Sequence, residues 1–186
     1  PLFAAGVING LGHHSGYRNF ECDDAARNLV PWGIFVGGEE LHNNHHAFPT
    51  SAKFSVRRWE FDIGWLYISV LRALGLARVN KVAPRPVLEE ASPGVDLDNL
   101  RAVIVNRMHV LRDYTKQVTL PALKRERAMA AGGAALRKAR TLLVRQPQLL
   151  DDGAQHRLQQ LLSDYSTLRT VHEFREKLRK LWSTAN

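Results

Sequence analysis

Apolar side chains recur at helical spacing along most of this 186-residue chain, and glycines and prolines separate the apolar runs. Residues 1–20 are small, apolar and rich in glycine, which predicts the end of an apolar helix followed by a turn. A second helix is predicted over 32–47, because Pro49 should stop it. Large apolar and aromatic side chains at helical spacing over 59–77 predict an amphipathic helix that packs in a core or lies at a membrane interface.

The segment from Val82 to Gly94 contains three prolines and a glycine, which predicts a linker. We therefore expect a first module over 1–84, a linker over 85–95 and a second, helical module over 96–186. The second module should open with Asp96 as the N-cap of a helix. That helix carries an apolar stripe made of Leu97, Leu100, Ile104, Met108, Leu111 and Val118.

Three further helices are expected in the second module. One should cover about 121–145, weakened by the pair Gly132-Gly133 and closed before Pro147. The next should begin at Asp151 or the residue after it, and the last at the capping-box pattern of residues 170–173. The apolar face of that last helix should lie inside and consists of Phe174, Leu178, Leu181 and Trp182. The whole pattern predicts an all-α fold.

Positive charge is concentrated in the second half of the chain. Residues 1–90 hold nine Lys or Arg against nine Asp or Glu, whereas 91–186 hold seventeen against nine, which accounts for the net charge of +8. Solvated helix faces are the simplest explanation, and anionic lipid headgroups or an acidic electron carrier are alternatives. We expect no nucleic-acid partner, because no recognition motif accompanies the high isoelectric point.

Other features narrow the class of protein. Cys22 is the only cysteine, so the chain has no intrachain disulfide, and nothing in the sequence marks this thiol as activated. Charged residues interrupt every apolar run before the roughly 18 residues that a membrane-spanning helix needs. The chain begins at Pro1 in the middle of an apolar pattern, so we expect it to be a fragment.

The stretch GGEELHNNHHAFP crowds three histidines, His42, His45 and His46, into five residues of a predicted helix. Offsets of three and four place His42 on the same face as both others, while His45 and His46 diverge by roughly 100 degrees. Such rings can serve two metal ions side by side, and imidazole suits iron, zinc, copper and nickel alike. A single helical histidine is usually a surface or core residue, but this spacing favours metal binding.

Metal-bound imidazoles usually donate their second N–H to a carboxylate or a carbonyl. Glu39 and Glu40, one turn before the cluster, are candidates for this supporting role. Asn43 is a further candidate, because an amide can orient a ring or hold a water.

HNNHH, at 42–46, resembles the third histidine box of the membrane-bound fatty acid desaturases. NGLGH (9–13) and GYRN (16–19) resemble the stretch before that box in the acyl-CoA or acyl-lipid delta-9 branch, and WEFDIGWLYI with LGLARVNKVAP resembles its bacterial members. The resemblance covers about residues 1–84. Residues 95–186 resemble a tail of some proteobacterial members.

The resemblance implies two non-haem iron ions held by histidine. His13, His42, His45 and His46 are the implied iron ligands, and Asn9 is implied to reach one metal through a water. His14 matches no such residue. No catalytic side chain beyond the ligands is implied. Two earlier histidine boxes and the transmembrane helices lie outside this sequence, so the remaining ligands do too.

The implied activity is oxygen-dependent insertion of a cis double bond into a saturated acyl chain. The substrate would be a membrane lipid or an acyl-CoA, and electrons would come from ferredoxin, rubredoxin or a similar carrier. The implied location is the cytoplasmic side of the inner membrane. Double-bond position, chain length and acyl carrier stay open.

Three alternatives stay open at this point. One is a fatty acyl hydroxylase on the same scaffold, since both reactions begin with hydrogen removal. Another is a truncated, non-catalytic helical binding module. The third is a zinc protein, which would bind one zinc ion through this chain alone.

Overall fold

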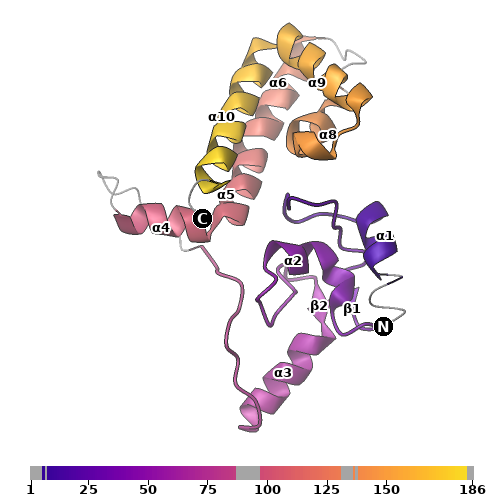
Figure 1. The fold of residues 1–186 in the computed structure, drawn as a ribbon, viewed down its shortest axis with the longest axis vertical. Helices are drawn as coiled ribbons and strands as arrows, with labels where there is room; N and C mark the ends of the chain where they lie inside the picture. Colours follow the sequence, from indigo (N-terminus) through magenta and orange to yellow (C-terminus); the bar gives the residue numbers. More distant parts are fainter. Residues whose placement is uncertain (1–5, 7, 87–96, 131–135, 137, 184–186) are drawn as a thin grey trace. The chain divides into compact units, whose positions relative to one another are not determined.

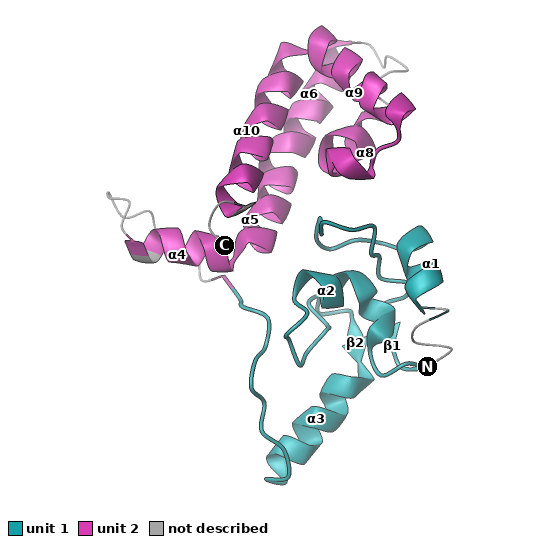
Figure 2. Cartoon of the chain, in the orientation of Figure 1, with its two compact units in different colours: residues 1–85 teal, residues 86–186 magenta. Residues whose placement is uncertain are grey.

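The computed structural model describes residues 6, 8–86, 97–130, 136 and 138–183. The chain is predominantly helical, which confirms the expected all-α class. It divides into two compact units, residues 1–85 and residues 86–186 (Figure 2). Within the described residues, no helix is long and apolar enough to cross a membrane.

Unit 1 (residues 1–85) is built from short elements joined by ordered loops (Figure 1). Its elements are α1 (Asn9–His14), β1 (Trp32–Gly33), η2 (Glu39–Leu41), α2 (His42–Ala47), β2 (Phe61–Asp62) and α3 (Ile63–Ala73). The two strands pair in parallel, with Trp32 opposite Phe61 and Gly33 opposite Asp62.

The prediction of one helix over 32–47 is wrong for its first half. Only η2 and α2 are helical there, and α2 ends before Pro49 as expected. Gly37 and Gly38 have φ angles of 68° and 103°, which break a right-handed helix. A Cβ atom at Gly38 would lie 2.7 Å from Asp62 Oδ1. The positive φ angle and this close approach both require glycine at position 38.

The predicted helix over 59–77 begins later and ends earlier than expected. Asp62 is the N-cap of α3, because its carboxylate accepts a hydrogen bond from the Trp65 N–H at 2.9 Å. The helix ends at Ala73, and Gly75 follows with a φ angle of 73°. No residue of α3 is buried, although most of its side chains are apolar.

Buried polar side chains hold unit 1 together. The carboxylate of Glu60 accepts hydrogen bonds from Tyr17 Oη at 2.8 Å and from Asn44 Nδ2 at 2.9 Å. Burial, and then the Glu60 carboxylate, raise the pKa of Tyr17 well above its ordinary value, so the phenol stays a donor. Asn28 Nδ2 also donates to Asn44 Oδ1 at 3.1 Å. This polar network joins α2 to loops distant in sequence.

Unit 2 (residues 86–186) is a helical assembly in which α10 runs alongside α5 and α6 (Figure 1). Its described elements are α4 (Leu97–Val105), α5 (Arg107–Tyr114), η3 (Thr115–Thr119), α6 (Leu120–Met129), α8 (Ala139–Val144), η4 (Pro147–Leu149), α9 (Asp152–Asp164) and α10 (Ser166–Ser183). η3 is a π-helical turn.

The predicted helix boundaries in unit 2 are partly right. Asp151 caps α9, as expected, by accepting a hydrogen bond from the Ala154 N–H at 2.7 Å. The helix that was predicted to carry the apolar stripe is broken after Val105. Its second part is α5, which η3 joins to α6. The predicted N-cap Asp96, the Gly132-Gly133 pair and residues 87–95 of the linker lie outside the described residues.

The capping-box prediction over 170–173 is wrong. α10 begins at Ser166 and runs through this pattern, and Thr170 Oγ1 bonds to the Ser166 carbonyl at 3.2 Å instead. Phe174 and Leu181 were expected inside but are 53% and 64% exposed. The side that faces inward carries Leu168, Arg175 and Trp182.

The leucine-rich core of the protein lies in unit 2. Its buried members are Ala122, Leu123, Leu136, Ala139, Leu142, Leu143, Leu150, Ala154, Leu158, Leu161 and Leu168. α6, α8, α9 and α10 each contribute to it, which gives these helices a shared apolar interior.

Candidate metal centre

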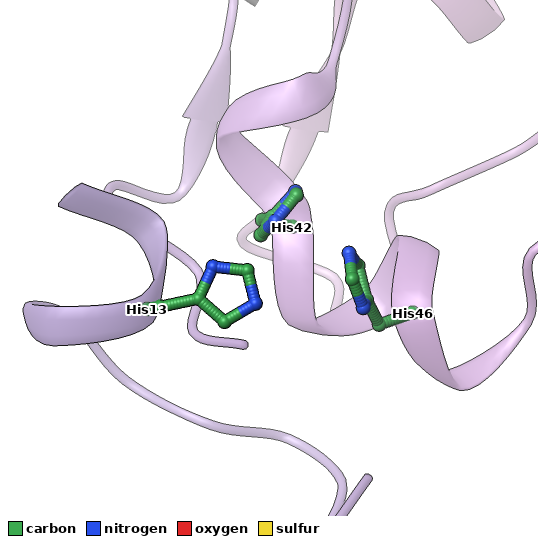
Figure 3. A group of neighbouring side chains, drawn as sticks. All are labelled: His13, His42 and His46. Carbon is green, nitrogen blue, oxygen red and sulfur yellow. The ribbon is translucent and has the colours of Figure 1, made fainter. Parts of the chain in front are cut away.

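Three of the predicted ligands come together in unit 1. His13 of α1 faces His42 and His46 of α2, and the three side chains turn toward one another (Figure 3). Each offers a ring nitrogen, and these nitrogens all lie within 4.8 Å of one another. The ring centroids of His42 and His46 are 4.2 Å apart, and those of His13 and His42 are 5.1 Å apart. This arrangement can hold a metal ion.

The partners of two of these rings fix where their protons lie. His13 Nδ1 lies 2.6 Å from the carbonyl oxygen of Asn9, one helical turn earlier. His46 Nδ1 is hydrogen-bonded to Asp24 Oδ2. A carbonyl and a carboxylate only accept, so Nδ1 is the donor in both rings and Nε2 keeps the lone pair in the neutral form. Both rings are therefore set to bind a metal through Nε2.

His42 lies at the centre of the group and is buried. Neither of its ring nitrogens has a hydrogen-bond partner among the described residues, and Glu39 Oε2 is 3.8 Å from Nδ1. The neighbouring His42 side chain lowers the pKa of Glu39 against the opposing effect of burial, so this carboxylate is ionised at neutral pH. A buried, unpaired imidazole is costly, and a bound metal ion would satisfy it.

His45 is not a member of this group of three. Its ring centroid is 6.4 Å from that of His42 and 5.7 Å from that of His46, and its ring meets Phe54 edge to face at 4.6 Å. Burial lowers its pKa, so the ring is neutral at pH 7, and its Nδ1 is buried without a partner. This placement suits a second metal position beside the first.

Gly12 allows α1 to approach α2. A Cβ atom at this position would lie 3.1 Å from His42 Cδ2, closer than ordinary van der Waals contact. The absence of a side chain thus lets His13, the next residue, reach the ring of His42. Sequence reasoning included this glycine in the motif NGLGH but did not assign it a role.

The other predicted supporting residues have different partners. Glu40 is buried, and its Oε1 accepts from the N–H groups of Phe35 and Val36 at 2.6 and 3.1 Å. Asn43 is fully buried, and its amide bonds to backbone groups of Phe20 and Ala26. Both side chains hold loops around the site, and neither has a described hydrogen bond to an imidazole.

Asp24 supports His46, and sequence reasoning missed it. Burial alone would raise its pKa, but the Ala26 N–H and His46 outweigh burial and lower it. Only its acidity could have signalled this role, since Asp24 precedes His46 by 22 residues. Asn9, predicted to act through a water, contributes its backbone carbonyl to His13, and its side chain is exposed.

Cys22 lies near this site but is not an activated thiol. It is buried, and burial raises its pKa to about 12. A thiol that stays protonated at neutral pH is a poor nucleophile.

Comparison with curated proteins finds desaturases. The chain is 46% identical over 79 residues to an sn-2 palmitoyl-lipid 9-desaturase of Nostoc sp. (strain 36), covering 42% of this chain and 27% of that relative. It is 38% identical over 79 residues to an sn-1 stearoyl-lipid 9-desaturase of Anabaena variabilis, covering 42% and 29%. Delta-9 acyl-lipid desaturase 1 of Arabidopsis thaliana is 41% identical over 71 residues, covering 38% and 23%.

Two further comparisons were with family models and with solved structures. A family model described as a transposase matches residues 99–186, which sequence reasoning did not anticipate. No solved structure matches the chain. The chain spans about a quarter of the length of these desaturases. The expected likeness to desaturases is thus confirmed for about two fifths of the chain, and most of unit 2 is similar to a transposase family.

Proposed function

We propose that unit 1 supplies part of the di-iron centre of a membrane-bound fatty acyl desaturase of the delta-9 acyl-lipid type. The observation that carries this proposal is the convergence of His13, His42 and His46, with both nitrogens of His42 buried and without a hydrogen-bond partner among the described residues. The similarity to curated 9-desaturases gives the cluster its chemical context.

In this proposal His13, His42 and His46 hold one iron, and His45 helps to hold the other. When bound, the irons would supply the oxygen-dependent removal of hydrogen from an unactivated methylene pair, which no side chain can perform. The remaining ligands would come from parts of the protein outside this chain.

The chain's own residues orient the ligands. The Asn9 carbonyl and the Asp24 carboxylate hold the Nδ1 protons of His13 and His46, so each Nε2 presents its lone pair inward. Gly12 keeps α1 close to the ring of His42. The Asn43 and Glu60 contacts keep the surrounding loops in place. The result is a preorganised half-site.

The decisive experiment uses the complete reading frame in a host without an aerobic desaturase. Membrane fatty acids are analysed by mass spectrometry for the unmodified protein and for His42→Ala, His45→Ala and His14→Ala. We expect monounsaturated chains from the unmodified protein and none from the first two variants, because each lacks a proposed iron ligand. His14→Ala is the matched control, since His14 follows His13 in α1 but is exposed and outside the group.

Other products would change the assignment. Hydroxylated chains would move it to a hydroxylase on the same scaffold. Monounsaturated chains that persist in His42→Ala would remove this cluster from the chemistry. No new product, with the protein present and iron and a reductant supplied, would favour a non-catalytic module.

We also propose that α3 rests on the membrane that contains the substrate. Tyr67, Leu74 and Leu76 are 62%, 67% and 72% exposed, although α3 and the turn after it are largely apolar. Residues 63–85 contain four cations, Arg72, Arg78, Lys81 and Arg85, and no acidic residue. An apolar helix with purely cationic flanks suits an anionic lipid surface.

Cosedimentation with vesicles tests this surface. The chain should bind phosphatidylcholine vesicles more tightly when they contain phosphatidylglycerol, since each cation near such a surface contributes about 1 kcal/mol. Replacing both Arg78 and Lys81 with Gln should therefore weaken binding roughly thirtyfold. Leu74→Ser should weaken it as well, whereas Met129→Ser in unit 2 should leave it unchanged. Equal binding by all variants would contradict the proposal.

A second candidate function concerns residues 99–186 alone. Their match to a transposase model, together with the positive charge of the second half, favours DNA binding, whereas the sequence analysis expected no nucleic-acid partner. Among the described residues of unit 2, no three His, Cys, Asp or Glu side chains are grouped to hold a metal ion. Fluorescence anisotropy with a duplex at two salt concentrations tests this candidate, because DNA binding should fall steeply with salt.

A further inference from the structure

We infer that Asp24 is a positioning residue for the metal centre, which holds His46 in one tautomer and strengthens it as a ligand. The inference rests on the proposed function, because it assigns His46 to a metal. It assigns a role to a residue outside the histidine motifs and 22 positions before His46.

The Asp24 carboxylate is held at both oxygens. Oδ2 bonds to His46 Nδ1, and Oδ1 accepts the Ala26 N–H at 2.9 Å. The side chain therefore has little freedom to leave the imidazole. A hydrogen-bonded carboxylate on the outer nitrogen fixes ring orientation and raises ligand basicity.

The loop that carries Asp24 is pinned on each side of it. Asn43 Nδ2 donates to the carbonyls of Phe20 at 2.8 Å and Ala26 at 3.0 Å. Arg18 Nη1 donates to the carbonyl of Asp24 itself at 2.9 Å. Because Asn43 belongs to α2, the loop is fastened to the helix that carries His46. The Asp24 carboxylate and the His46 imidazole are therefore held in fixed positions relative to each other.

The three rings of the cluster differ in what supports them. His13 donates to a neutral backbone carbonyl, and the nearest carboxylate oxygen to His42 is 3.8 Å away, beyond hydrogen-bond distance. Of the three, His46 is the ring whose described hydrogen-bond partner is a carboxylate. We therefore expect the loss of Asp24 to act on His46 first.

The first test reads the tautomer of His46 without any metal. The full 186-residue chain, labelled with nitrogen-15 in histidine, is compared with Asp24→Ala, Asp24→Asn and Asp23→Ala by long-range proton–nitrogen correlation. His46 should carry its proton on Nδ1 in the unmodified chain. Asp24→Asn has one side-chain oxygen, which can accept from His46 or from the Ala26 N–H but cannot replace both carboxylate oxygens, so it should hold the Nδ1–H form less completely. Asp24→Ala should shift His46 toward the Nε2–H form. Asp23 is the control because it is the adjacent acid and is exposed.

The second test is a cobalt(II) titration of the same variants, followed by the visible absorption of the bound ion. Asp24→Ala should bind cobalt roughly 10- to 100-fold more weakly than the unmodified chain, and Asp24→Asn should lie between them. Asp23→Ala should match the unmodified chain. Circular dichroism of the metal-free variants identifies any that are misfolded. If Asp24→Ala is one of them, Asp24→Asn, which is closest to aspartate in shape, becomes the deciding variant.

The outcomes separate this inference from the proposed function. An unmodified chain that binds no cobalt would count against the metal site itself, and the His46 tautomer would still decide whether Asp24 positions the ring. Cobalt bound equally by the unmodified chain, Asp24→Ala and Asp24→Asn would overturn the inference and leave the metal site intact. An unchanged His46 tautomer in Asp24→Ala would overturn it as well.

Discussion

The two units differ in the side chains that hold them together. Every residue of the leucine-rich core cluster belongs to unit 2. Unit 1 instead buries Asn19, Asn28, Asn43, Asn44 and Glu60. On its surface it exposes Trp32, Phe35, Trp59, Tyr67 and Leu74.

This difference concerns both the interior and the surface of the two units. Unit 2 gathers its leucines in one internal core, as helical domains do, although it also exposes Leu97, Met129 and Leu181. Unit 1 is held by directed hydrogen bonds and exposes several aromatic side chains, including Trp32, Phe35 and Tyr67. Among the described residues, most of the exposed aromatic side chains lie in the unit that carries the histidine group.

Removing the amide of Asn43 should give the largest effect on stability. Asn43→Ala would leave the N–H groups of Asn19 and Phe20 and the carbonyl of Ala26 without this partner. We expect unit 1 to lose roughly 3 to 5 kcal/mol, since each buried group left unpaired costs about 1–3 kcal/mol. Hydrogen exchange resolved by residue should show faster exchange throughout unit 1 and unchanged exchange in unit 2.

The control for this prediction is Asn80→Ala, which alters an exposed asparagine of the same unit. It should leave exchange unchanged. Equal effects of the two substitutions would show that buried hydrogen bonds do not hold unit 1.

Truncating Leu168 should produce the corresponding effect in unit 2. Leu168 is fully buried in the leucine-rich core. Leu168→Ala should cost about 3 kcal/mol through the cavity it leaves. Chemical denaturation followed by tryptophan fluorescence of Trp182, the tryptophan of unit 2, measures this loss. Met129→Ala, at a position 80% exposed, should change stability by less than about 0.5 kcal/mol.

Two glycines of α1 test the packing inside unit 1, because Gly12 lies against His42 and Gly10 does not. A Cβ atom at Gly10 would meet nothing within 4 Å, whereas one at Gly12 would press on His42. Gly10→Ala should stabilise unit 1 by about 0.5–1 kcal/mol through helix propensity. Gly12→Ala should lose that gain, because it forces His42 from its rotamer at a cost of order 1 kcal/mol.

Cobalt titration adds a second measurement to the glycine pair. Gly12→Ala should bind cobalt more weakly and Gly10→Ala as well as the unmodified chain. Unaltered binding by Gly12→Ala would mean that the approach of α1 does not position the ligands.

The smallest expected effect is a pH dependence in unit 2. Burial lowers the pKa of His172 below 6.5, so the folded state favours the neutral ring and the unfolded state binds the proton more readily. Its contribution is therefore complete above about pH 6.5 and falls as the pH drops from there to the folded pKa. Stability measured between pH 5 and 8 should decline less steeply in His172→Asn. Identical slopes would exclude His172 as a source of the dependence.

Local sequence patterns predicted much of unit 2. The N-cap at Asp151 and the end of a helix before Pro147 depend on neighbouring residues and were correct. The capping box at 170–173 failed because the chain already turns at Tyr165, and α10 passes through the pattern. Phe174 was expected inside because it is apolar, but His172 and Arg175 are buried on that helix.

In unit 1 the local patterns were less reliable. The helix expected over 32–47 is interrupted because Gly37 and Gly38 adopt positive φ angles and Glu40 binds the backbone of the preceding turn. Glu40 and Asn43 were expected to support imidazoles because they are close in sequence. Their hydrogen bonds go to loop backbone instead, which only the folded chain reveals.

The sequence by itself determined that His42, His45 and His46 lie close together, because three histidines within five residues of one helix are a local feature. It also determined the apolar stripes of unit 2, since helical spacing is a local property. Only the tertiary structure decided that His13 joins His42, that Gly12 permits this approach and that Asp24 supports His46. Each of these contacts joins residues that are 22 or more positions apart in the sequence. Local sequence patterns do not extend that far, so they could not predict these contacts.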